Sequence, residues 1–206
     1  MYLSQRNNAF TKLRSFIRER KPAEKCELCK VELGRMHQHL IDPVSRAIVC
    51  SCEACSMLFF TGDGKYRRIP RSIRFLKDFK MTDAGWESLL IPINMAFFFY
   101  SGSVGRVVAF YPSPAGPTES LLPLESWNEI TEANPVLKSL EEDTEALLVN
   151  RVKKDDPQHF IAPIDKCYEL TGLIRAYWQG LGGGSEVWEE ITKFFTELKK
   201  QARVEK

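Results

Sequence analysis

Apolar residues recur at helical spacing in three stretches of the chain. In residues 9–20 they are interspersed with basic residues, and the pattern stops at Pro22 (Phe10, Leu13, Phe16 and Ile17). A second helix is predicted after Asp165, which is placed to cap it, with one shared face (Leu170, Leu173, Ile174, Tyr177 and Trp178). A third helix is predicted to begin at Ser185, with Glu residues in its early turns and Lys residues near its end, the order that the helix dipole favours. Its apolar residues form one stripe that is expected to be buried (Val187, Ile191, Phe195 and Leu198).

Shorter apolar runs between these helices predict strands. Four are expected (residues 46–50, 93–100, 106–111 and 145–152), and residues 101–105 suit a hairpin between the second and the third. The proline-rich YPSPAGPT sequence that follows is expected to form a rigid loop, and short helices are predicted over 82–90 and 125–133. Strands and helices without strict alternation indicate an α+β domain with a short antiparallel sheet and C-terminal helices.

Four cysteines near the start of the chain form two C-x₂-C pairs separated by 22 residues (Cys26, Cys29, Cys52 and Cys55). A C-x₂-C turn returns both thiolates to the same side, so two such turns can build a tetrahedron around one ion. In a chain without a secretory signal, clustered cysteines indicate metal rather than disulfides. The sequence therefore predicts a four-cysteine, zinc-ribbon-like module with Zn²⁺ as the preferred ion.

Two other occupants use the same ligands and stay open. Iron suits four thiolates in a rubredoxin-like site. Cys50 is interpreted first as a spare buried thiol on the strand 46–50, and otherwise as part of an iron–sulfur cluster or as a ligand in place of Cys52. Neither cysteine pair is followed by glycine, because Lys30 and Ser56 stand there, which weakens the rubredoxin-like interpretation.

His37 and His39 lie between the cysteine pairs, on one face of an extended segment. They are interpreted as exposed or hydrogen-bonded residues, as alternative metal ligands, or as catalytic residues of a nuclease similar to the HNH family. The last interpretation departs from that family's pattern, because Gln38 separates the histidines and no His or Asn closely follows Cys55. No paired acid and base is visible elsewhere, so the chain is not predicted to be an enzyme.

The composition predicts no membrane-spanning segment, and the charged residues are unevenly distributed along the chain. The chain has 206 residues, 44% of them hydrophobic, and the most apolar stretch, 91–100, is too short to cross a bilayer. With no N-terminal signal, a cytoplasmic location is expected. Residues 1–80 carry 17 Lys or Arg and 8 Asp or Glu, whereas residues 81–206 carry 12 and 19.

We therefore predict three parts: a helix and metal module (1–62), a basic linker (63–79) and an α+β domain (80–206). The linker has four arginines that could dock onto the acidic second half or onto a polyanion such as a nucleic acid (Arg67, Arg68, Arg71 and Arg74). No recognition-helix or RNA-binding motif accompanies them, so nucleic-acid binding is the lesser alternative.

Several stretches together resemble an uncharacterised bacterial family encoded beside actinobacterial-type nickel–iron hydrogenases, which have high affinity and tolerate oxygen. The stretches are CELC, HQHLID, VCSCEACSMLF, IPINMAFFF, RVVAFYPSPAGPTES and PIDKCYELTGLIRAYWQGLGGG. The resemblance implies a cytoplasmic accessory protein for assembly, maturation or electron delivery, with hydrogenase subunits or maturation factors as partners. It supplies no catalytic residues. An accessory role through protein–protein contacts is the leading expectation, and a rubredoxin-like electron carrier is the alternative.

Overall fold

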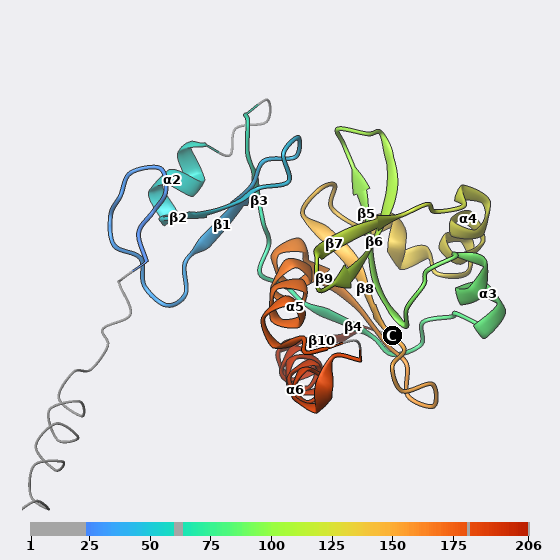
Figure 1. Cartoon of the computed structure of the whole chain (residues 1–206). Coiled ribbons are helices and arrows are strands. Elements are labelled where there is room, and N and C mark those ends of the chain that lie inside the picture. Colours follow the sequence, from blue (N-terminus) through green and yellow to red (C-terminus); the bar gives the residue numbers. More distant parts are fainter. Residues whose placement is uncertain (1–23, 60–63, 181, 206) are drawn as a thin grey trace, which may run out of the picture.

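The computed structural model describes residues 24–59, 64–180 and 182–205, which form two sheets and their helices (Figure 1). The helix predicted over residues 9–20 lies outside the described residues. Within the described residues no helix combines the length and apolar character that crossing a membrane requires.

The smaller sheet has three antiparallel strands in the order β2-β1-β3. They are β1 (Gln38–Ile41), β2 (Ile48–Ser51) and β3 (Arg67–Arg68), and helix α2 (Glu53–Leu58) follows β2 directly. We call residues 24–59 together with β3 the cysteine module. All four cysteines of the predicted metal site lie in it.

The larger sheet has seven strands in the order β10-β4-β9-β8-β5-β6-β7. The strands are β4 (Arg74–Leu76), β5 (Met95–Ser101), β6 (Arg106–Ser113), β7 (Gly116–Ser120), β8 (Glu145–Asn150), β9 (Gln158–Pro163) and β10 (Arg203–Glu205). All pairs are antiparallel except β10 with β4. The predicted α+β class is confirmed.

Helices cover both faces of the larger sheet. They are α3 (Asp83–Ser88), α4 (Leu124–Ala133), the short 3₁₀ helix η1 (Pro135–Ser139), α5 (Ile164–Tyr177) and α6 (Gly184–Gln201). Phe97 and Phe99 of β5 pack in the core beneath α5 and α6, whereas Phe98 packs in the core beneath α3 and α4. Burial on both faces explains why β5 reads as a continuous hydrophobic run.

The proline-rich sequence predicted as a rigid loop is instead a hairpin of β6 and β7. Pro112 of β6 lies opposite Pro117 of β7, and β6 has already left its other neighbour, β5, at Phe110. Each proline therefore stands where no second strand needs its missing N–H group. Gly116 starts β7 with a φ of 121°, a backbone conformation that glycine adopts easily.

The stretch predicted as a basic linker contributes a strand to each sheet, β3 and β4. Between these strands Ile69 and Ile73 are buried, and with Ile41 of β1 they belong to the same core as Phe97. Arg46 adds a surface contact, since its guanidinium lies 4.9 Å from the Phe110 ring centroid and 3.4 Å from a Glu119 carboxylate oxygen. The cysteine module and the large domain (residues 74–205) therefore share one core.

Candidate metal centre

Cys26 and Cys29 lie in a tight turn closed by backbone hydrogen bonds. The Cys26 N–H donates to the Val31 carbonyl and the Lys30 N–H to the Cys26 carbonyl, both at 2.8 Å. Lys30 has a φ of 67°, in the left-handed region where glycine is usual at this position of such turns. The Lys30 ammonium donates to the Glu27 carbonyl at 2.9 Å, which helps to hold the turn without glycine.

Cys52 and Cys55 lie at the start of α2. Cys52 is the N-cap of the helix, and its Sγ accepts a hydrogen bond from the Cys55 N–H at 3.4 Å. Because this turn continues directly into the helix, Ser56 has a helical backbone and the turn needs no glycine. The positive end of the helix dipole also favours thiolates there.

The four cysteines converge. Their Sγ atoms all lie within 4.8 Å of one another, and the Cys29 and Cys52 sulfurs are 3.7 Å apart. A tetrahedron with Zn–S distances of ~2.3 Å has edges of about 3.8 Å, so the spacing fits one ion. The described cysteines are all free of disulfides. This cluster can hold a metal ion, and its four thiolates suit zinc or iron equally.

The protonation of the cluster is uneven. Burial would raise the pKa of Cys26, but backbone N–H groups of Cys29, Cys52 and Leu28 outweigh it and lower the pKa to about 6. Burial, followed by hydrogen bonds with the other three thiols, raises the pKa of Cys55 to about 12. A bound cation must therefore displace at least the Cys55 proton, as metal–thiolate bonds require.

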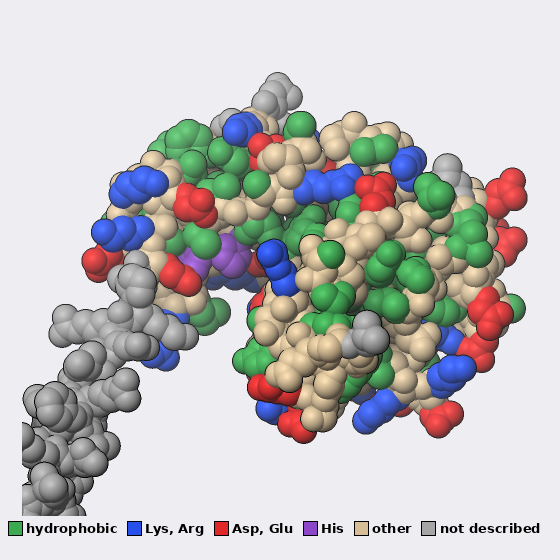
Figure 2. All heavy atoms as spheres, in the orientation of Figure 1, with side chains coloured by type: hydrophobic (Ala, Val, Ile, Leu, Met, Phe, Trp, Pro, Cys, Tyr) green, Lys and Arg blue, Asp and Glu red, His purple; other side chains and the backbone are tan. Residues whose placement is uncertain are grey.

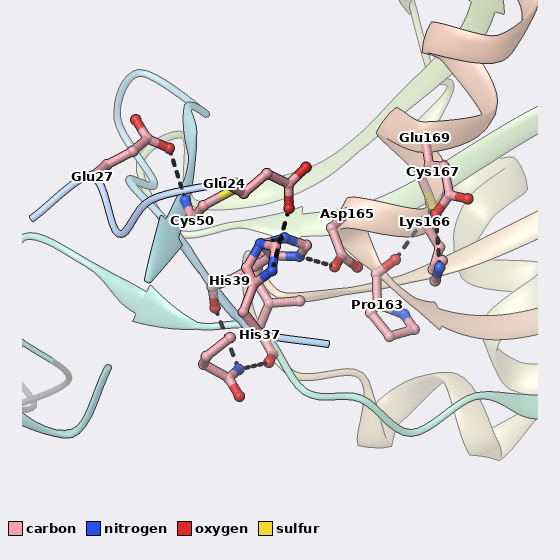
Figure 3. A network of polar contacts seen from close by, with 12 residues as sticks. Glu24, Glu27, His37, His39, Cys50, Pro163, Asp165, Lys166, Cys167 and Glu169 are labelled. Atoms are coloured by element: carbon pink, nitrogen blue, oxygen red, sulfur yellow. Dashed lines mark hydrogen bonds and ion pairs between the residues drawn. The ribbon is translucent and has the colours of Figure 1, made fainter. Parts of the chain in front are cut away.

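His37, His39 and Cys50 form a second group, with ligand atoms within 4.8 Å of one another. The two imidazoles meet with Nε2 atoms 3.1 Å apart (Figure 3). His39 Nδ1 lies 2.6 Å from Oδ2 of Asp165, at the start of α5. His37, His39 and Cys50, the possible alternative ligands of the four-cysteine site, therefore form a separate group. Cys52 lies with the other three cysteines.

Asp165 is the residue that the sequence did not connect with this region. It was expected to cap α5, but the N-cap is Pro163 and Asp165 lies in the first turn. It is 126 positions away from His39 along the chain, and no spacing rule spans that distance.

The predicted basic docking residues are largely engaged within the fold. Arg68 pairs with Glu53 at 2.7 Å, and Arg74 pairs with Glu145 at 3.3 Å and Glu205 at 3.4 Å. Arg67 also has an interaction partner, and Arg71 is exposed. These arginines therefore do not present four unpaired charges to a polyanion.

No curated protein and no solved structure shows significant similarity to the chain. A protein-family profile matches residues 25–202, which contain both groups of potential ligands and nearly all of the two sheets. The chain therefore belongs to the family of unknown function DUF5947.

Proposed function

We propose that this chain is a cytoplasmic, non-catalytic accessory protein that holds Zn²⁺ at Cys26, Cys29, Cys52 and Cys55. The observation that carries the proposal is the convergence of four thiols from two separate turns. Four protein thiolates fill the tetrahedral coordination of zinc and leave no position for water or substrate, which is typical of structural sites. The ion then fixes the shape of the cysteine module.

Exposed apolar side chains on the module favour a protein partner. Several large ones lie between positions 31 and 59 (Val31, Met36, Val44, Met57, Leu58 and Phe59). Met36 is 83% exposed and Leu58 70%, and Figure 2 shows hydrophobic side chains gathered over α2. Apolar groups concentrated on a small module are characteristic of interaction surfaces.

The proposed partner is a nickel–iron hydrogenase subunit or one of its maturation factors. This part of the proposal rests on the resemblance described from the sequence, and the module's apolar surface supplies a place for the contact. The protein would assist assembly or maturation by docking rather than by chemistry.

Affinity capture from native cells that produce the hydrogenase tests this proposal. The tagged full chain should retain hydrogenase subunits or maturation factors, and the Met57→Ser/Leu58→Ser variant should lose most of them. Leu121→Ser is the matched control, because Leu121 is 90% exposed but lies outside the module. Capture that is equal for all three proteins, or no hydrogenase component with any of them, would overturn the proposed partner.

A rubredoxin-like electron carrier is the second candidate. Cys29 is exposed, so an iron ion at the four thiolates would lie close to the surface, where electrons can be exchanged. Elemental analysis with an ultraviolet–visible spectrum of the purified protein separates the candidates. Zinc with a featureless visible spectrum supports the structural role, whereas iron with thiolate charge-transfer bands supports the carrier.

A further inference from the structure

The hairpin of β1 and β2 brings one cysteine and two histidines to the same face. His39 lies directly opposite Cys50 in the β1–β2 register, and opposite residues of an antiparallel pair project to the same side. His37 precedes His39 by two positions and joins the same side, consistent with the alternation of an extended segment. The geometry of this group thus follows from strand pairing and needs no contribution from the four-cysteine cluster.

The hydrogen bonds of the two imidazoles determine where their lone pairs lie. His39 Nδ1 faces the Asp165 carboxylate at 2.6 Å, and His37 Nδ1 faces the Gly34 carbonyl at 3.1 Å. Both partners only accept, so each Nδ1 carries a hydrogen and, in neutral rings, each Nε2 carries a lone pair. These two lone pairs face each other across 3.1 Å, an arrangement that needs a positive charge between them.

We propose that His37, His39 and Cys50 bind a second metal ion, a divalent first-row transition metal held by two Nε2 atoms and one thiolate. Two imidazole ligands of a tetrahedral ion with Zn–N distances of 2.0–2.1 Å are about 3.4 Å apart, close to the observed separation. Imidazole and thiolate together suit zinc, cobalt or nickel. With three protein ligands the fourth position stays open to water or another small ligand, unlike the coordination of an ion enclosed by four cysteines.

Asp165 is the positioning residue of this site. Its Oδ2 accepts from His39, and its Oδ1 is buried without a hydrogen-bond partner among the described residues. A carboxylate behind a metal-bound histidine fixes the ring and strengthens it as a ligand. Because Asp165 belongs to α5 of the large domain and His39 to the module, the site lies where the two parts meet (Figure 3).

A proton is the competing occupant. One imidazole could carry a hydrogen on Nε2 and donate it to the other, with Asp165 balancing the charge. Metal stoichiometry separates the two cases, since a proton-bridged pair takes up no second ion.

The experiment is a Co²⁺ titration of the reduced, metal-free full chain, followed by its visible spectrum. The wild type should take up two equivalents, one with the absorption of four thiolates and one with the weaker charge transfer of a single thiolate. His39→Gln should take up one equivalent and keep the four-thiolate spectrum. Cys29→Ser should perturb the four-thiolate spectrum and keep the weaker one, so failure at either site is recognised separately.

Asp165→Asn supplies a graded test of the positioning role. It should retain both equivalents while the second binds 10–100-fold more weakly, as is typical for outer partners of metal ligands. Cys50→Ser, which leaves both histidines in place, checks the loss independently if His39→Gln does not fold, and circular dichroism reports folding. Saturation of the wild type at one equivalent with a four-thiolate spectrum would overturn the proposal. Uptake of an unchanged second equivalent by both His39→Gln and Cys50→Ser would also overturn it.

Discussion

Single residues in the two cysteine turns show how the same ligand spacing is built on different backbones. Lys30 adopts a left-handed conformation after Cys29, whereas Ser56, at the equivalent place after Cys55, is helical. The sequence alone could identify both positions as departures from glycine. It could not show that only one of them needs a residue tolerant of positive φ, because that depends on whether a helix follows.

Substitution by glycine at these two positions should therefore have opposite effects. Lys30→Gly relieves a left-handed conformation that costs a non-glycine residue about 1–2 kcal/mol, and should raise the free energy of unfolding by up to ~1 kcal/mol. Ser56→Gly is the matched control and should lower it by about 0.5–1 kcal/mol, because glycine weakens a helix. Denaturant unfolding of the metal-bound protein measures both, and a destabilised Lys30→Gly variant would contradict the strain argument.

His159 makes stability depend on pH. It is buried on β9, stacked on Phe79 with 4.5 Å between ring centroids, and burial followed by the nearby Arg151 lowers its pKa to about 4. Between pH 6.5 and 4 the unfolded chain binds a proton at this histidine and the folded chain does not. The contribution of this histidine to the free energy of unfolding is therefore fully present above pH 6.5. It is lost as the pH falls towards 4, by on the order of 3 kcal/mol.

The comparison of wild type with His159→Gln isolates this contribution, because other titrating groups are common to both proteins. Unfolding free energies measured from pH 7.5 to 4 should converge as the pH falls, with the wild type losing more stability. Parallel curves would mean that the folded protein binds a proton at His159 as readily as the unfolded chain does.

At the scale of elements, the sequence predicted most of the longer strands and helices. Strands β2, β5, β6 and β8, and helices α3 to α6, were expected close to where they lie, whereas the six-residue strand β9 was missed. Strands β3, β4 and β10 were missed because two or three residues show no period, and β7 because its prolines indicated a loop. The four cysteines were found because their spacing is local, whereas Asp165 reaches its site only through tertiary packing.

The buried side chains of strand β5 should tolerate truncation to alanine least. Phe98 is fully buried in the core beneath α3 and α4, where its ring stacks on Trp127 with 5.2 Å between centroids. Phe98→Ala should cost about 3–5 kcal/mol through lost burial and the cavity left behind. Tyr100→Ala on the same strand is the control, because Tyr100 is 40% exposed and should cost much less. Equal losses would mean that Phe98 is not enclosed in a core beneath α3 and α4.

At the scale of the whole molecule, two parts with different sources of stability share one core. The large domain has a second core beneath α3 and α4 that contains no residue of the cysteine module. The module has strands of only two to four residues, and a unit of this size buries too little apolar surface to be stable without another source of stability. Its order should therefore depend on the metal, and that of the large domain should not.

Hydrogen exchange with and without a strong chelator checks this difference. Removal of the ion should speed amide exchange in β1, β2 and α2 by well over tenfold, since each factor of ten corresponds to only about 1.4 kcal/mol. Exchange in β5 and β8 should stay unchanged. Equal protection of the module in both conditions would show that the ion does not stabilise it.

The short passage between the sheets has a mechanical consequence. Only residues 69–73 separate β3 from β4, and both Ile69 and Ile73 are buried. Residues 69–73 therefore do not form a flexible linker that would let the module move independently of the large domain. A partner that pulls on the module would therefore load β4 directly, and through it the parallel neighbour β10 at the sheet's edge.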